Sequence, residues 1–323
     1  MIWPRLAVSL FLIGAIVGLA VLTHARASRR ERAVEAAFPA VGRIIMVNGL
    51  KVHALTMGAG PDVILIHGAS GNLRDLLSLM QALAPHFRVT AFDRPGMGWS
   101  DPLADGTSLA AQARHIAAAA GQLGLRDPLL VGQSYGGSVA LAWALDAPLV
   151  PRALVPRALV LVSSPSLPWP GKLDPWYRLT NTRLGRALAI PLVAAFTPDG
   201  YVTATTTAIF APNPVPDHYA DLIGAGLALR RSTLRGNTSQ VNALRAELVA
   251  QSPRYPGLTL PVELIHGDAD TIVPLTVHSL PLSGVIPGAR LTILPGLGHM
   301  PHHADQGAVL QAIARADQRS RLR

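Results

Sequence analysis

The segment 132–136 reads GQSYG and matches the G-x-S-x-G pattern of a serine nucleophile. An apolar, strand-like run precedes it and a helix-forming run follows it, so Ser134 is expected on a sharp turn between a strand and a helix. Such a turn projects the hydroxyl, and glycines flank it because larger side chains would collide there. A Gly-rich turn that only packs closely is the alternative, and the strand–turn–helix context disfavours it. The pattern predicts nucleophilic chemistry at Ser134.

A serine hydroxyl needs a base, and the base needs an orienting acid. His299 follows the last expected strand and lies next to a glycine, so a loop can place its imidazole over the edge of a sheet. Asp270 follows the preceding expected strand, and Asp268 is a rival two residues earlier. We expect Asp270 to be the acid because it lies further beyond the strand end, whereas Asp268 is placed to cap the turn.

Two backbone N–H groups are expected to stabilise an oxyanion, those of Ala69 and Tyr135. Ala69 follows the first buried strand in the segment 67–71, which reads HGASG, and Tyr135 begins the helix after the nucleophile. Amide groups at the start of a helix are free and lie at its positive end. His67 is a possible second base, but its place in the turn favours a structural role.

Strands alternate with helices from residue 42 onward, and most of the strands are apolar on both faces. Runs with strand character cover residues 43–47, 52–56, 63–66, 88–92, 129–132, 159–162, 262–265 and 291–294. This alternation predicts an α/β fold with a mostly parallel, doubly wound sheet and helices on both faces. The expected organisation is an anchor and basic linker over 1–40, a core in two parts over 41–165 and 256–323, and an inserted segment over 166–255.

The inserted segment is expected to be a mainly helical cap, because about ninety residues replace a loop that is ordinarily 2–6 residues long in α/β proteins. Helices are predicted over 217–229 and 239–249. Its apolar and aromatic residues are expected either to line a substrate pocket or to form a small core of the cap itself. The residues concerned are Leu167, Trp169, Trp176, Tyr177 and Phe210.

Residues 41–314 resemble the α/β-hydrolase superfamily, in particular its capped, serine-nucleophile branch with esterases, lipases and carbon–carbon bond hydrolases. Four motifs occur in the family's order: His67-Gly68, the segment 93–100 (DRPGMGWS), the turn at Ser134, and the segment 267–270 (GDAD) with Gly298-His299. The resemblance implies the α/β-hydrolase fold. Members that open epoxides or displace halide carry Asp as nucleophile, so the serine indicates acyl chemistry instead.

The apolar stretch Leu6–Leu22 contains no charged residue and is long enough to cross a bilayer core of about 30 Å. It predicts a single N-terminal membrane helix. A cleaved signal peptide is the alternative, since Ala25-Arg26-Ala27 offers a cleavage site, but the stretch is longer than the apolar region of an ordinary signal peptide. Four arginines follow the stretch and one precedes it, which favours a cytoplasmic catalytic domain.

These features predict a serine hydrolase that cleaves an ester or similar acyl bond of a small or lipid-like substrate through an acyl-enzyme, with no cofactor or metal. Alternatives are carbon–carbon bond hydrolysis or cofactor-free perhydrolysis by the same residues, and a ligand-binding protein without activity. Carbon–carbon hydrolysis calls for a basic residue to hold a substrate carboxylate, for which the candidates are Arg178, Arg183, Arg230 and Arg231. The net charge of +9 is concentrated near the termini, which favours anionic lipid over nucleic acid as a partner.

Overall fold

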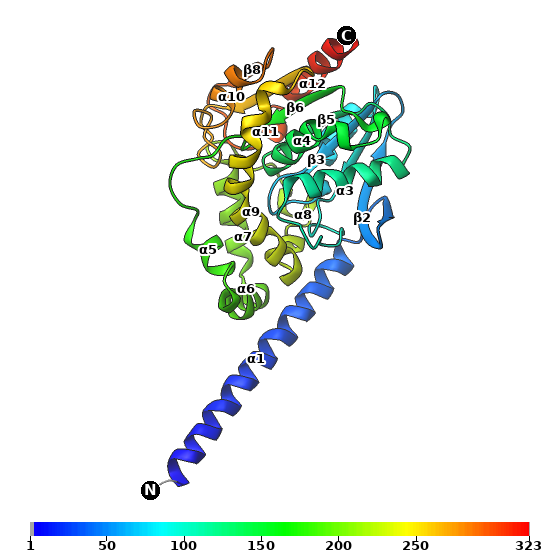
Figure 1. Cartoon of the computed structure of the whole chain (residues 1–323). Helices are drawn as coiled ribbons and strands as arrows, with labels where there is room; N and C mark the ends of the chain where they lie inside the picture. Colours follow the sequence, from blue (N-terminus) through cyan, green and yellow to red (C-terminus); the bar gives the residue numbers. More distant parts are fainter. Residues whose placement is uncertain (1–2, 323) are drawn as a thin grey trace.

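The computed structural model describes residues 3–322; residues 1–2 of the expected anchor and the C-terminal Arg323 lie outside the described part. An eight-stranded sheet forms the centre of the fold, in the order β1-β2-β4-β3-β5-β6-β7-β8 (Figure 1). β1 and β2 pair antiparallel, β2 joins β4 antiparallel, and every other pairing is parallel. The strands are β1 (Arg43–Val47), β2 (Leu50–Met57), β3 (Asp62–Ile66), β4 (Arg88–Phe92), β5 (Leu129–Gln133), β6 (Ala158–Val162), β7 (Val262–Gly267) and β8 (Arg290–Leu294).

Helices cover both faces of the sheet, and the two core clusters show which helices share a face. α3, α4 and α10 pack in one cluster and α2 and α12 in the other. β3, β5 and β6 are buried along their whole length, as expected of central parallel strands covered on both sides. The core helices are α2 (Leu77–Leu83), α3 (Leu109–Gln122), α4 (Tyr135–Leu145), α10 (Ser279–Val285), α11 (Pro301–Ala304) and α12 (Gln306–Arg321), with the short turns η1 (Leu73–Leu76), η2 (Ala147–Leu149) and η3 (Arg152–Leu154).

The chain between β6 and β7 is helical and lies beyond the carboxyl ends of the parallel strands (Figure 1). It contains α5 (Pro175–Thr180), the π-helical turn η4 (Gly185–Ala189), α6 (Ile190–Phe196), α7 (Asp199–Phe210), α8 (Tyr219–Leu222), η5 (Ala225–Leu229), α9 (Arg231–Gln251) and η6 (Ser252–Gly257). The helix predicted over 217–229 is wrong as one element: it is broken into α8 and η5, since Gly224 between them has φ +60°. Leu244 and Leu248 of α9 join the main core, so the end of the inserted segment is continuous with the body of the fold.

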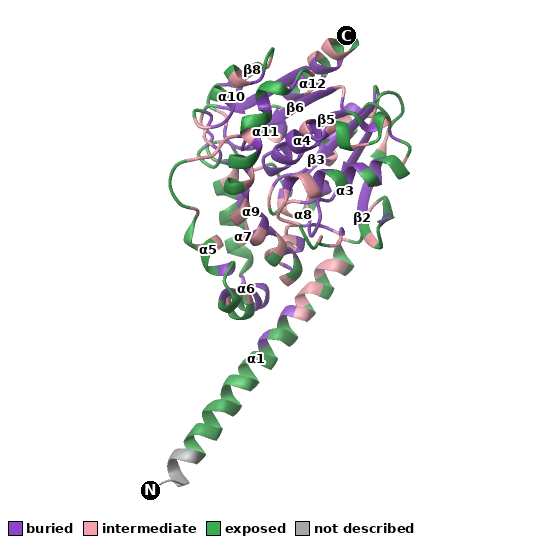
Figure 2. Ribbon diagram, in the orientation of Figure 1, coloured by how far each residue is buried: buried purple, intermediate pink, exposed green. Residues whose placement is uncertain are grey.

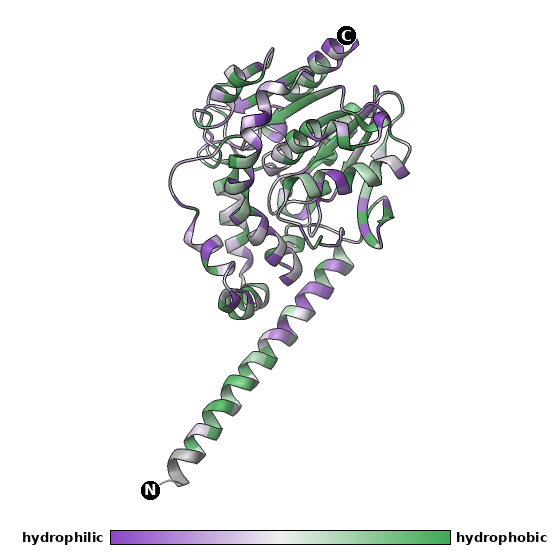
Figure 3. Ribbon diagram, viewed as in Figure 1, coloured by the Kyte–Doolittle hydropathy of each residue, from purple (hydrophilic) through white to green (hydrophobic). Residues whose placement is uncertain are grey.

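The N-terminal helix α1 (Trp3–Ala37) projects from the body, and the stretch from Ala7 to Leu22 is apolar and exposed (Figures 2 and 3). It is long and apolar enough to cross a membrane, and only 6% of its most apolar window is buried in the protein. Its C-terminal part contacts α6 and η5 of the inserted segment. Ala27 packs there against Ala194 and Ala195, where small side chains let the two helices approach closely.

Candidate active site

Ser134 stands between β5 and α4 with φ +48° and ψ −126°, a strained conformation for a residue other than glycine. Its N–H donates to the carbonyl of Val162 at 2.8 Å, which ties the turn to the neighbouring strand β6. A Cβ on Gly136 would lie 2.1 Å from the Ile66 carbonyl oxygen, and one on Gly132 would lie 2.4 Å from the Cα of Gly137. The glycines of the sequence pattern are therefore required by close backbone packing.

The structure brings Ser134, His299 and Asp270 together from three separate strand ends. The Nε2 atom of His299 lies 3.0 Å from the Ser134 Oγ, within hydrogen-bond reach for proton transfer. On the other side of the ring, Nδ1 lies 2.8 Å from the Asp270 Oδ2. The carboxylate selects the tautomer in which Nδ1 carries the proton and Nε2 is free to accept one.

Asp270 is buried and held from several directions. Its Oδ1 accepts hydrogen bonds from the N–H groups of Ile272 and Val273, both at 2.9 Å, and its Oδ2 lies 3.2 Å from His266 Nε2. Burial alone would raise the pKa of Asp270, but the hydrogen bonds from His266 and His299 outweigh it and hold that pKa well below its usual value. A permanently ionised carboxylate therefore faces the imidazole.

Asp268, the rival for the acid, lies exposed and away from the imidazole. Its Oδ1 accepts a hydrogen bond from the N–H of Gly296 at 2.7 Å, which links the loops after β7 and β8. His67 is also structural in its contacts: Nδ1 lies 2.8 Å from the carbonyl oxygen of Gly68, and Nε2 accepts from the N–H of Arg94 at 3.0 Å. Both ring nitrogens of His67 are occupied, so neither is free to act as a base.

Ala69 and Tyr135, the expected oxyanion donors, flank Ser134. Ala69 lines the same cavity as Ser134 and His299. Tyr135 is the first residue of α4, whose N–H has no acceptor within the helix. The side chain of Tyr135 points away into the core, where its hydroxyl accepts from Gln112 at 3.1 Å.

Above Ser134 lies a cavity of about 800 Å³, formed between the strand ends and the inserted segment. That volume falls within the range of small-molecule sites. Its walls are mostly apolar, and α7 contributes the greatest number of lining residues, ahead of α6, η5 and α9. In the part of the chain that the structure describes, no Lys or Arg lines this cavity.

Residues 63–312, more than three quarters of the chain, match the sequence model of the alpha/beta hydrolase family. The chain belongs to this family. A Mycobacterium tuberculosis protein of uncharacterized function is 30% identical to the hydrolase over 298 residues, covering 89% of this chain and 84% of its own. The 2-hydroxy-6-oxo-2,4-heptadienoate hydrolase of Pseudomonas putida is 25% identical over 276 residues, covering 80% of this chain and 90% of its own. The solved structure of a bacterial membrane phospholipase A is similar in fold over 99% of both chains, with a TM-score of 0.63 and 20% identity.

The expected pocket residues of this hydrolase divide between two environments. Trp176 and Tyr177 line the cavity. Leu167 and Trp169 pack instead against the main core, and Phe210 forms a small buried cluster with Tyr219 and Met300. Trp176 and Tyr177 therefore fit the pocket interpretation and Phe210 fits that of a small separate core, whereas Leu167 and Trp169 fit neither.

The four candidate arginines do not reach the cavity. Arg231 forms a close ion pair with Glu31 of α1 at 2.7 Å, and Arg230 pairs with Glu35 at 3.0 Å. Arg178 and Arg183 are exposed on the outside of the inserted segment. None of them is placed to bind a substrate carboxylate beside Ser134.

Arg94 belongs to the 93–100 motif, but its own role at the site was not predicted from the sequence. Its guanidinium is fully buried, donates to the carbonyls of His67 and Gly68 at 3.0 and 2.9 Å, and lies 4.2 Å from the centre of the Tyr135 ring. It also donates to Gln240 of α9 at 2.6 Å. Burial lowers the pKa of Arg94 to about 10, which leaves it charged at neutral pH. Arg94 thus fixes the loop before Ala69 and joins it to the inserted segment.

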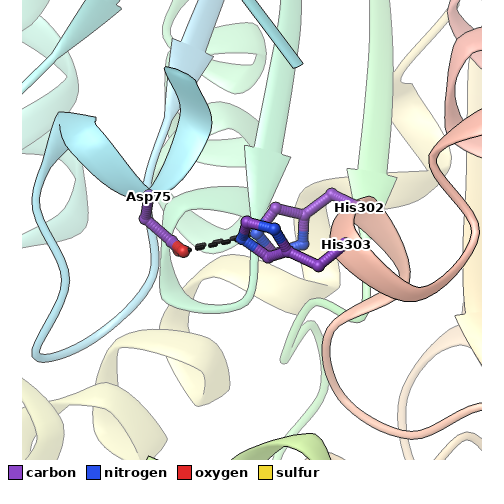
Figure 4. Close-up of side chains that lie close together, drawn as sticks. All are labelled: Asp75, His302 and His303. Carbon is purple, nitrogen blue, oxygen red and sulfur yellow. Dashed lines mark hydrogen bonds and ion pairs between the residues drawn. The ribbon is translucent and has the colours of Figure 1, made fainter. Parts of the chain in front are cut away.

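A second missed group contains Asp75, His302 and His303 (Figure 4). The carboxylate of Asp75 lies 2.9 Å from His303 Nε2 and 3.5 Å from His302 Nε2, and Tyr219 donates its hydroxyl to it at 2.6 Å. Burial would raise the pKa of Asp75, but the hydrogen bonds from both histidines hold it well below the usual value. These side chains are of types that bind divalent cations, yet both carboxylate oxygens already face protein groups. The cluster connects η1, α8 and α11 next to His299.

Proposed function

We propose that this hydrolase is a membrane-anchored serine esterase that cleaves an ester, or a similar acyl bond, of a lipophilic substrate. The observation that carries the proposal is the linear arrangement of Ser134 Oγ, the His299 ring and the Asp270 carboxylate, with contacts of 3.0 and 2.8 Å, at the floor of an apolar cavity. Packing alone has no need for these three residue types at three strand ends. In this proposal the inserted segment 166–255 is the cap.

In the proposed reaction His299 takes the proton of Ser134 as its oxygen attacks the ester carbonyl. The N–H groups of Ala69 and Tyr135 hold the oxyanion, and the acyl-enzyme forms as His299 gives the proton to the departing alcohol. Water, deprotonated by His299, then releases the acid. Asp270 keeps the imidazole in the required tautomer and stabilises its charged form.

Carbon–carbon hydrolysis is the second candidate, favoured by the similarity to the Pseudomonas putida enzyme. Substrates of that kind carry a carboxylate, and an anion in a mostly apolar cavity needs a cationic partner. No described Lys or Arg lines the cavity, so the geometry favours an uncharged ester. Perhydrolysis would use the same three residues and is a side reaction of the acyl-enzyme.

The N-terminal helix is proposed to remain attached as an anchor. Ala27, the last residue of the expected cleavage site, is completely buried against α6, and cleavage there would divide a continuous helix within its contacts. The basic residues after the apolar stretch favour the cytoplasmic side for the catalytic body.

The proposal is tested with p-nitrophenyl esters from acetate to laurate and with fluorophosphonate labelling of the full chain in detergent. We expect ester hydrolysis with a preference for longer chains, and Ser134→Ala to lower kcat by more than about 10⁴-fold and abolish labelling. Ser283→Ala on α10, far from the cavity, is the matched control. A folded wild-type protein that neither hydrolyses any ester nor reacts with the probe would instead be a binding protein.

A further inference from the structure

The helical run from Leu184 through η4 and α6 carries a row of exposed apolar side chains on its outer face. Four large residues follow one another at intervals of four: Leu184 (67% exposed), Leu188 (56%), Leu192 (46%) and Phe196 (44%). Residues four apart lie on the same side of a helix, so they form one stripe. Contiguous exposed apolar surface of this kind marks an interaction site. We call these four residues the outer stripe.

The contacts between α1 and α6 place the outer stripe at a defined height along the anchor. The apolar stretch of α1 ends at Leu22, and Ala27, one to two turns later, packs against α6. Arg26 donates to the carbonyl of Ala195 at 2.8 Å, and Arg30 to that of Thr197 at 2.7 Å. Five residues of helix span about 7.5 Å, close to the depth of the headgroup layer. When the apolar stretch spans the hydrocarbon core, α6 therefore lies at the level of the headgroups.

The charges around this junction suit a membrane surface. Arg29 and Arg32 are exposed on α1 directly beyond the apolar stretch, and Arg183 is exposed beside Leu184. Basic side chains at this height attract anionic headgroups. The combination of an apolar face with flanking basic residues is typical of helices that lie in the membrane interface.

The cavity above Ser134 opens at the outer stripe. Leu192 and Phe196 belong to the stripe and also line the cavity, and Tyr201 at the start of α7 is 61% exposed and lines it too. The run Gly185–Phe196 meets α7 at an angle of 101°. α7 leads inward from this corner, and its residues Val202 and Ile209 continue the apolar wall toward His299. One continuous apolar surface thus connects the outside of α6 with the nucleophile.

We infer that the outer stripe rests in the interface of the bilayer that holds α1, and that the substrate is a long-chain acyl ester dissolved in that leaflet, which enters the cavity at α6 without passing through water. The inference rests on the proposed esterase function and names its substrate class. The bilayer is the occupant because α6 contacts α1 just beyond its apolar stretch, so lipid lies beside the stripe whenever α1 is inserted.

The position of the stripe is tested first, by a readout that does not require activity. The chain has no cysteine, so Leu188→Cys introduces a unique site for the fluorophore NBD. The labelled full chain is reconstituted into vesicles of phosphatidylethanolamine and phosphatidylglycerol, with and without brominated acyl chains. The control is Leu280→Cys on α10, which is also exposed (47%) but lies at the opposite end of the body (Figure 1).

We expect the bromolipids to quench NBD at position 188 by at least about twofold, while NBD at position 280 is unaffected, because only the first probe lies within the leaflet. Absence of quenching at position 188 would overturn the inference. An emission shift that grows with protein density without bromolipid quenching would also overturn it, since it would assign the stripe to a second copy of the chain.

The entry route is tested with the double variant Leu184→Glu, Leu188→Glu, whose side chains do not line the cavity. Turnover of p-nitrophenyl palmitate dissolved in the same vesicles is divided by turnover of water-soluble p-nitrophenyl butyrate. We expect this ratio to fall by about tenfold or more, because two carboxylates keep the entrance of the cavity out of the membrane interface. Leu280→Glu should leave the ratio unchanged. An unchanged ratio would overturn the inference. Failure of the wild-type protein to hydrolyse either ester would overturn the esterase proposal itself.

Discussion

At the scale of single residues, two aspartates only two positions apart have different surroundings. Asp270 is buried, accepts two backbone N–H groups and faces His299, whereas Asp268 is exposed and caps the loop at Gly296. The extra two residues carry the carboxylate past the end of β7 and turn it toward the sheet edge. This pair provides an internal comparison for the role of the acid.

Replacing Asp270 by Asn should lower kcat for p-nitrophenyl butyrate strongly, by as much as the roughly 10⁴-fold loss known for this change in a serine protease, because the amide stabilises the wrong imidazole tautomer. Asp268→Asn keeps an oxygen to accept the N–H of Gly296 and should change kcat less than about threefold. Equal losses in the two variants would contradict the assignment of Asp270.

At the scale of elements, the core strands follow from local pattern. The strands predicted over 43–47 and 88–92 have the observed bounds of β1 and β4, and the other six are within two residues at each end. Buried parallel strands read as continuous apolar runs, which makes them visible in a single sequence. The three residues at the strand ends were predictable for the same reason, because they follow those runs directly.

The inserted segment was less predictable, since its helices owe their positions to contacts distant in the sequence. Arg94 meets Gln240, and Ser70 N–H donates to Asn237 at 2.8 Å, across separations of 146 and 167 residues. α5, α6 and α7 present apolar side chains both to the cavity and to the exterior, so no single apolar face marks the side of each helix that packs inward. The network of Asp75 with the two histidines could not be predicted either, because these residues are also distant in the sequence.

The docking of α1 on the body gives two deletions of the anchor different expected effects on stability. Cutting after Leu22 removes the exposed apolar stretch, whereas cutting after residue 33 also removes Glu31, which bonds Arg231 through both carboxylate oxygens. The shorter deletion should leave stability unaltered, and the longer one should lower the free energy of unfolding by about 1–3 kcal/mol by leaving partly buried Arg231 unpaired. Urea unfolding followed by tryptophan fluorescence compares them, and equal stability of the two proteins would show that the docked turns contribute nothing.

At the scale of the whole molecule, two buried histidines make the folded state sensitive to mild acid. Burial, aided by the nearby charge of Arg94, lowers the pKa of His67 from 6.5 to about 4. Burial and the neighbouring His266 lower the pKa of His278 from 6.5 to about 4 as well. Between those values the unfolded chain binds protons that the folded chain does not.

The free energy of unfolding should therefore have its highest value above pH 6.5. It should decline as the pH falls toward 4, by about 1.4 kcal/mol per pH unit for each histidine. We expect the full chain in detergent to be roughly 2–4 kcal/mol less stable at pH 5 than at pH 7 in urea unfolding. His278→Gln should reduce this difference, while His218→Gln at an exposed position should not. The same stability at both pH values would contradict the neutral state assigned to these histidines.

The inserted segment is held at two places. α6 and the start of α9 are held by α1, through Arg26, Arg30 and the Arg231–Glu31 ion pair, whereas the end of α9 belongs to the core through Leu244 and Leu248. A membrane helix tilts when the hydrocarbon thickness differs from its apolar length. In the proposed membrane-anchored state, tilting of α1 would move α6 and the start of α9 relative to the core, so the width of the cavity entrance would depend on the thickness of the bilayer.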